Sequence, residues 1–279
     1  MKKFSINTKV RITVAAVLII LYCLFIIANH YKAIYHPEAP MQDIGYLLSK
    51  ATLTPLDYSF LLSQTGLGKP ALDDLLKKPD GITRIQSIQK NYYIRHKMII
   101  EKLNTFTRQE TLDLECINNT SDLGMAPLKN GDILLTKSTH TLFWRHGHCG
   151  IVIDANKGIT LESLEPGTIS MKQDISKWQY YSTLKIMRLK NVKYNAIEKV
   201  VRYVEDNLIG KEYRILAFKK TGKAVPDYVN CSQLIWQAFI SSGLDLDSNK
   251  GIFVTPEDIA KSPLLEVVQI KGFDPDKAW

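Results

Sequence analysis

The sequence predicts an α+β fold that begins with a membrane-spanning helix. From about Leu128 onward, several strand-like segments follow one another with only a few helices beside them, which favours α+β over a doubly wound parallel sheet. Residues from about 41 to 111 have helical spacing, and the N-terminal segment is apolar. We therefore expect three parts: residues 1–35 as tail, anchor and spacer, 36–120 as a helical module, and 121–279 as the main domain.

The apolar run from Ile12 to Ala28 is the predicted membrane anchor, because only Thr13 and Tyr22 interrupt it. As a helix, this run would rise roughly 25 Å, close to the lower limit for crossing a bilayer core. Four cations precede it, at Lys2, Lys3, Lys9 and Arg11. The positive-inside rule then keeps the N-terminus in the cytoplasm. Because Ile26–Asn29 is a poor cleavage site, we expect an uncleaved single-pass anchor in the cell membrane. The main domain would lie outside the cytoplasm, in the periplasm where an outer membrane exists.

The composition is that of a globular protein, with 45% hydrophobic residues and a formal net charge of +8. Beyond the N-terminal cations the charge is scattered, so no nucleic-acid partner is expected. None of the four cysteines forms a CxxC pair or a zinc-like spacing. Cys23 lies in the apolar run. Cys116 and Cys149 could form a disulfide in an exported domain, which would leave Cys231 free.

The predicted helical module follows a spacer marked by Pro37 and Pro40. Its expected helical pieces are Asp43–Lys50, Leu56–Leu62, Ala71–Leu76 and the longer Ile82–Phe106. We expect this module to pack on the main domain or to space it from the anchor.

The main domain contains strand and helix signals in close succession. The predicted strands are 131–136, 150–153, 159–161, 184–189 and 265–270. Leu184–Leu189 alternates as a half-exposed strand does. An amphipathic helix is expected over Asn195–Leu208, and a short capped one over Thr255–Ile259, with proline at its first position.

Cys231 stands at the predicted start of a further helix. Positions 231, 234, 235, 238 and 239 share one helix face, so the thiol should point toward the core. The N-terminal end of a helix carries partial positive charge, which lowers the pKa of a cysteine and favours the nucleophilic thiolate.

A base for this thiol is expected at His148, at the head of the predicted strand that contains Gly150–Ile153. Strand alternation places His146 and His148 on one face and Cys149 on the other. A third polar group should orient the imidazole. A hairpin centred on Asn156-Lys157 would bring Glu165 opposite His148, whereas an odd-length loop would bring Glu162 to that face. These residues alone leave both open.

Four segments together resemble the permuted papain-like cysteine hydrolases, and more closely the YiiX/YebB-like branch of the NlpC superfamily. They are Asn130–Leu134, Gly147–Val152, Leu161–Ser163 and Asn230–Trp236. The resemblance covers about Leu128 to Ile270. It implies a circularly permuted papain-like fold, in which a small antiparallel sheet or barrel packs against the Cys231 helix. It also implies Cys231 as nucleophile, His148 as base and Glu162 as orienting residue. Cys149 departs from the usual valine, and Gln233 stands where the family often has glutamate.

The expected activity is hydrolysis or transfer of an amide or acyl group through a thioester, with the Cys231 backbone amide as one oxyanion donor. No cofactor or metal is required, and cell-wall peptides or lipid acyl groups are the expected substrates. One alternative is a metal-dependent hydrolase using His140, His146, His148 and Glu162, although no HExxH signature accompanies them. Another is a non-catalytic module that binds fragments of the cell envelope.

Overall fold

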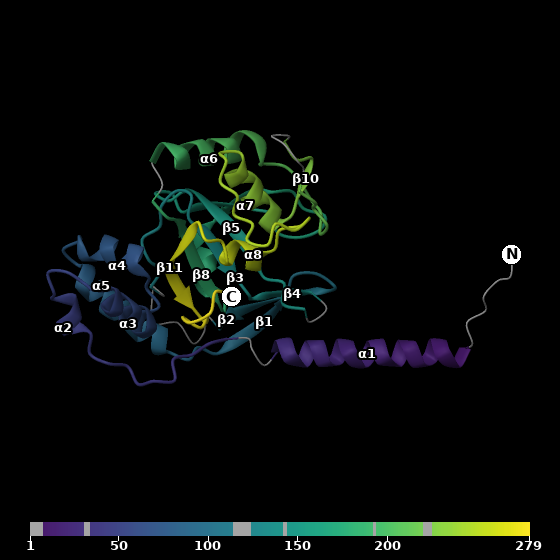
Figure 1. The fold of residues 1–279 in the computed structure, drawn as a ribbon, viewed down its shortest axis with the longest axis horizontal. Helices are drawn as coiled ribbons and strands as arrows, with labels where there is room; N and C mark the ends of the chain where they lie inside the picture. The colour runs from purple at the N-terminus through teal and green to yellow at the C-terminus, as the bar shows by residue number, and fades with distance from the viewer. Residues whose placement is uncertain (1–7, 31–33, 114–123, 142–143, 192–193, 220–224) are drawn as a thin grey trace.

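The computed structural model describes residues 8–30, 34–113, 124–141, 144–191, 194–219 and 225–279. Its centre is a six-stranded antiparallel sheet of order β11-β8-β3-β5-β6-β7 (Figure 1). These strands are β3 (Ile133–Thr136), β5 (His148–Asp154), β6 (Ile159–Glu162), β7 (Met171–Asp174), β8 (Leu184–Leu189) and β11 (Leu265–Lys271). The five strands predicted for the main domain are therefore confirmed. β7 was not predicted.

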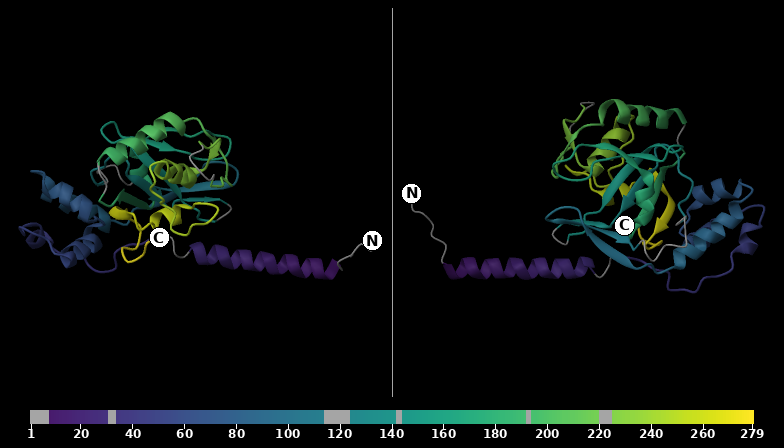
Figure 2. Two further views of the ribbon diagram at one scale, coloured as in Figure 1. Left: turned by 45° about the horizontal axis from the view of Figure 1, so that its top comes forward. Right: turned by 180° about the vertical axis from the view of Figure 1, so that it is seen from behind.

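Helices cover both faces of this sheet and divide the core into two layers (Figures 1 and 2). One face packs against α6 (Tyr194–Asn207), α7 (Cys231–Ile240) and α8 (Pro256–Ala260). The other face packs against α2 (Gly45–Leu48), α3 (Pro55–Thr65), α4 (Lys69–Leu76) and α5 (Gly81–Tyr93). The N-terminal helices thus share a hydrophobic cluster with the sheet. This cluster includes Leu72 of α4 together with Leu134 of β3 and Val152 of β5.

A second, three-stranded sheet lies beside the first, in the order β1-β2-β4. It contains β1 (Met98–Lys102), β2 (Thr107–Leu112) and β4 (Thr139–Thr141), and β1 and β2 form a hairpin. Two shorter elements complete the fold: the parallel pair β9 (Glu212–Tyr213) and β10 (Tyr228–Val229), and the 3₁₀ helix η2 (Ile175–Tyr180).

The predicted helix over Ile82–Phe106 is wrong in its second half, because α5 ends at Tyr93 and the β1–β2 hairpin follows. The side-chain oxygen of Asn104 accepts hydrogen bonds from the backbone N–H groups of Phe106 and Thr107, at 2.9 Å each. Such an asparagine turn reverses the chain, and the β-branched residues on either side then pair as strands.

The membrane anchor predicted at Ile12–Ala28 is also wrong. Within the described ranges, no helix combines the length and the apolar character that crossing a membrane requires. The segment does form a helix, α1 (Thr8–His30), which extends away from the two sheets (Figure 1). The predicted single-pass placement in the cell membrane, with an extracytoplasmic main domain, depended on this anchor and is contradicted by the same finding.

Candidate active site

Cys231 is the first residue of α7, as predicted, and it lies where this helix meets strand β5. The helix begins here because the side chain of Asn230 accepts a hydrogen bond from the Gln233 backbone N–H at 2.8 Å. The predicted apolar face is confirmed, since Leu234, Ile235, Ala238 and Phe239 are all buried. Cys231 itself is 9% exposed and belongs to the hydrophobic cluster on this face of the sheet.

His148 begins β5, and its ring lies beside the Cys231 thiol, so that each group shifts the pKa of the other. Its Nε2 atom lies 2.7 Å from Oε2 of Glu162. The other ring nitrogen, Nδ1, is therefore the one left to exchange a proton with the thiol. The ring also stacks on Trp178, with a centroid distance of 5.5 Å and an interplanar angle of 16°. The stack on Trp178 and the hydrogen bond to Glu162 together fix the orientation of the imidazole ring.

The register of β5 and β6 decides which glutamate meets His148. Gly150 pairs with Glu162 and Ile151 with Leu161, but a bulge between Val152 and Asp154 shifts the register by one residue. Glu162 therefore points to the His148 face. The hairpin that would bring Glu165 opposite His148 does not form. Glu165 instead accepts a hydrogen bond from the Asn104 side chain at 2.5 Å.

The Glu162 carboxylate is fully buried and each of its oxygens has partners. Oε1 accepts from the Thr160 hydroxyl at 2.6 Å and from the Trp178 indole N–H at 2.9 Å. Oε2 faces His148 and the Lys177 ammonium, which is 3.0 Å away. Gly150 is needed beside it, because a Cβ there would lie 2.8 Å from the Glu162 Cγ. A buried charge is tolerated only when it is paired and hydrogen-bonded in this way.

Electrostatics favour a charged triad. Burial raises the pKa of Glu162, but the hydrogen bond and charge of His148 outweigh it and bring the value to about 2. Burial lowers the pKa of His148, but the hydrogen bonds to Cys231 and Glu162 outweigh it and raise the value to about 9. The pKa of Cys231 falls well below that of a free thiol, first through a hydrogen bond with Cys149 and then through His148. These pKa directions favour a thiolate, an imidazolium and a carboxylate at Cys231, His148 and Glu162.

Cys149 has a role that its position on the opposite strand face did not suggest. Burial and the adjacent Cys231 raise the pKa of Cys149 well above its usual value, so the Cys149 thiol stays protonated beside Cys231. It is a free cysteine in the structure. Cys116, its suggested disulfide partner, lies outside the described residues.

The alternative metal set is not assembled. His146 has both ring nitrogens engaged, Nδ1 with the Gly147 carbonyl at 2.8 Å and Nε2 with the Thr141 hydroxyl at 2.9 Å. His140 lies 3.9 Å from Glu110, apart from His148 and Glu162. Across the described ranges, no three histidine, cysteine, aspartate or glutamate side chains are grouped to hold a metal ion.

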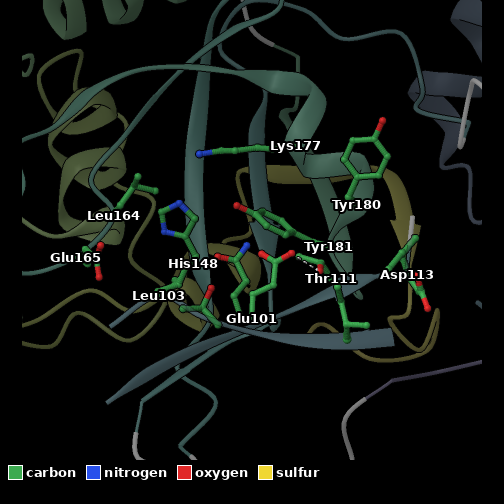
Figure 3. A pocket seen from close by; sticks show the side chains of 14 residues that line it. Glu101, Leu103, Thr111, Asp113, His148, Leu164, Glu165, Lys177, Tyr180 and Tyr181 are labelled. Atoms are coloured by element: carbon green, nitrogen blue, oxygen red, sulfur yellow. Dashed lines mark hydrogen bonds between the residues drawn. The ribbon is translucent and has the colours of Figure 1, made fainter. Parts of the chain in front are cut away.

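A cavity of about 660 Å³ opens beside this site, and His148 forms part of its wall (Figure 3). The β1–β2 hairpin closes one side and the segment from Lys177 to Tyr181 closes another. Sequence reasoning predicted neither the cavity nor the contacts of Lys177 and Trp178 with Glu162, since both arise from distant segments. Thr160 could have been found, because it lies two residues before Glu162 on the same strand face.

Comparison with known proteins gives one partial similarity. The chain is 30% identical over 155 residues to the uncharacterized protein YycO of Bacillus subtilis (strain 168), which covers 47% of this chain and 52% of YycO. The chain therefore spans about half the length of this curated relative. No family model matches the chain, and no solved structure matches it.

Proposed function

We propose that this protein is a cysteine hydrolase that cleaves, or transfers, an amide or acyl group through a thioester. One observation carries the proposal: a buried histidine links a helix-terminal cysteine to a buried glutamate, with a 2.7 Å hydrogen bond on the glutamate side. Nucleophile, base and orienting group in contact are the arrangement that covalent catalysis requires. The order of His148, Glu162 and Cys231 along the chain also supports it, because it resembles the YiiX/YebB-like branch of the permuted papain-like hydrolases.

In the proposed mechanism, the Cys231 thiolate attacks the substrate carbonyl carbon and forms a C–S bond. The His148 imidazolium then gives its proton to the leaving amine or alcohol as the original C–N or C–O bond breaks. Neutral His148 next takes a proton from water, whose oxygen attacks the thioester carbonyl carbon. The C–S bond then breaks, which releases the carboxylic acid and restores the Cys231 thiolate and the His148 imidazolium. Another nucleophile in place of water would make the reaction a transfer.

Two groups stabilise charge during these steps. Glu162 orients the imidazole and stabilises its cationic form. The backbone N–H of Cys231 lies in the first turn of α7, where no intrahelical acceptor exists, so it is available to the oxyanion. No metal or organic cofactor takes part. The proposed substrates are cell-wall peptides or lipid acyl groups.

Substitution Cys231→Ala is expected to abolish the reaction and to remove the most reactive thiol. Iodoacetamide at pH 6 should label the wild-type protein at Cys231 first, because ordinary thiols with a pKa near 8.5 are almost fully protonated there. Peptide mapping by mass spectrometry measures the labelled site. Cys23→Ala, which changes an exposed cysteine on α1, is the matched control and should leave Cys231 labelling unchanged. Unaltered labelling and turnover in Cys231→Ala would contradict the mechanism.

The pH dependence should reflect the thiolate–imidazolium pair. Because the pKa of Cys231 is lowered and that of His148 is raised to about 9, alkylation of Cys231 should be nearly constant from pH 6 to about 8.5. Turnover should fall as the pH rises through about 9, since His148 then lacks the proton that the leaving group needs. Alkylation rates measured across this range provide the check. A rate that rises about tenfold per pH unit up to pH 8.5 would indicate an ordinary thiol instead.

A further inference from the structure

The cavity beside His148 contains apolar side chains that the protein leaves uncovered. On the inner face of β1, Ile99 is 39% exposed, and Leu103 just beyond the strand is 42% exposed. Leu112, Leu164 and Tyr181 complete the apolar part of the wall. Apolar side chains arranged around a concave space of about 660 Å³ are typical of a small-ligand site.

The hairpin presents this face by strand alternation. Ile99 pairs with Thr111 and Glu101 with Gln109, and these four residues line the cavity. Ile100 is on the opposite face of β1 and is 62% exposed. The cavity is therefore a built feature of the β1–β2 hairpin rather than a gap between loops.

The cavity meets the triad at His148, which lines its wall, whereas Cys231 is not among the lining residues. Figure 3 shows Leu103, Leu164 and Glu165 near His148, with Tyr180 and Asp113 at the other side of the cavity. Because the Cys231 thiol lies beside the same imidazole, the acyl group of a substrate bonded to Cys231 would extend past His148 to reach this apolar wall.

The charges on the wall argue against an acidic occupant. Glu101 accepts a hydrogen bond from Thr111 and Glu165 accepts one from Asn104, yet in the described part of the chain neither has a cation at ion-pair distance. The ammonium of Lys177 is already paired with Glu162 at 3.0 Å. A chain bearing carboxylates would meet two negative charges here, whereas an uncharged chain would not.

We propose that this cavity binds the apolar, uncharged acyl chain of the substrate. This inference rests on the proposed function and selects an acyl substrate over an acidic wall peptide. The acyl carbon becomes bonded to Cys231 Sγ as the leaving group departs with the His148 proton, and water then releases the carboxylic acid. Burial of the chain should raise kcat/KM about three- to fourfold per methylene, up to the length that the cavity holds.

The test uses the full chain and 4-nitrophenyl esters of acetate, butyrate, hexanoate and octanoate. Wild-type kcat/KM should rise along the series, with octanoate at least tenfold above acetate. Ile99→Trp should fill the cavity and lower the octanoate-to-acetate ratio at least tenfold. Ile100→Trp, the neighbouring substitution on the outer face of the same strand, should leave the ratio unchanged. The γ-glutamyl 4-nitroanilide should be a poor substrate, and Glu101→Gln should improve it.

Other outcomes separate the two proposals. A flat wild-type series with Cys231-dependent acetate turnover, equal effects of the two tryptophan variants, or preference for the glutamyl substrate would overturn the acyl-chain site and leave the hydrolase intact. Binding of a fluorescent octanoyl amide to Cys231→Ala, weakened by Ile99→Trp only, supports the site independently of turnover. Absence of both ester turnover and amide binding would overturn the acyl-chain site together with the hydrolase.

Discussion

Substitution His148→Ala is expected to lower kcat/KM by about 10³-fold, because it removes the general base and acid of the proposed reaction. Without the imidazolium, the Cys231 thiol also loses one of the two hydrogen bonds that lower its pKa. Alkylation at pH 6 should therefore slow together with turnover. Ester hydrolysis and alkylation rates, measured on the same preparations, test both effects.

A control substitution at another histidine distinguishes loss of the catalytic base from a general effect of replacing a histidine on the fold. His36→Ala changes a half-buried histidine that belongs neither to the triad nor to the cavity wall, and it should retain wild-type turnover. Far-UV circular dichroism confirms that each variant is folded. A His148→Ala protein that keeps turnover within tenfold of wild type would refute the assignment of His148 as the base.

Substitution Glu162→Ala is expected to cost about 3–5 kcal/mol of unfolding free energy, since it leaves the buried His148 and the Lys177 ammonium without their carboxylate. For a chain of this size, that loss corresponds to a melting temperature lower by roughly 10 °C. Glu198→Ala, an exposed position on α6, should change stability by less than about 0.5 kcal/mol. Thermal unfolding followed by circular dichroism provides the measurement.

The isosteric variant Glu162→Gln distinguishes shape from charge. Glutamine can still accept from Trp178 and Thr160, so part of the stability should return. Activity should stay low, because a neutral amide stabilises the imidazolium less than a carboxylate does. Equal activity of Glu162→Gln and wild type would show that the carboxylate charge is dispensable.

The stabilising effect of the Glu162–His148 pair should depend on pH in a defined way. The folded-state pKa of Glu162 is lowered from 4.5 to about 2, so its contribution is present above pH 4.5 and is lost as the pH falls toward 2. The folded-state pKa of His148 is raised from 6.5 to about 9, so its contribution is present below pH 6.5 and is lost as the pH rises through 9. The stability difference between wild type and Glu162→Ala should be largest between pH 4.5 and 6.5.

The structure contradicts two sequence-based predictions about secondary structure and membrane placement. Helical spacing over Ile82–Phe106 and hydropathy over Ile12–Ala28 are averages along the chain. The asparagine turn at Asn104 overrides the first average by pairing two strands. The second is contradicted within the described residues, where no helix has the length and apolar character needed to cross a membrane.

Sequence alone determined the features that depend on neighbours in the chain. These are five of the six strands of the central sheet, the start of α7 at Cys231, and the placement of His148 at the head of β5. Local periodicity and capping chemistry are sufficient for such elements. The residues by themselves left Glu162 and Glu165 as alternatives, and only the resemblance favoured Glu162.

Tertiary structure alone decided how the site is completed. One bulge in β5 turns Glu162 toward His148, because a shift of one residue exchanges the two faces of a strand. Long-range packing brings Trp178 and Lys177 to the carboxylate, and it sets the β1–β2 hairpin across the cavity. Such contacts join segments far apart in sequence, where no local pattern specifies which side chains will meet.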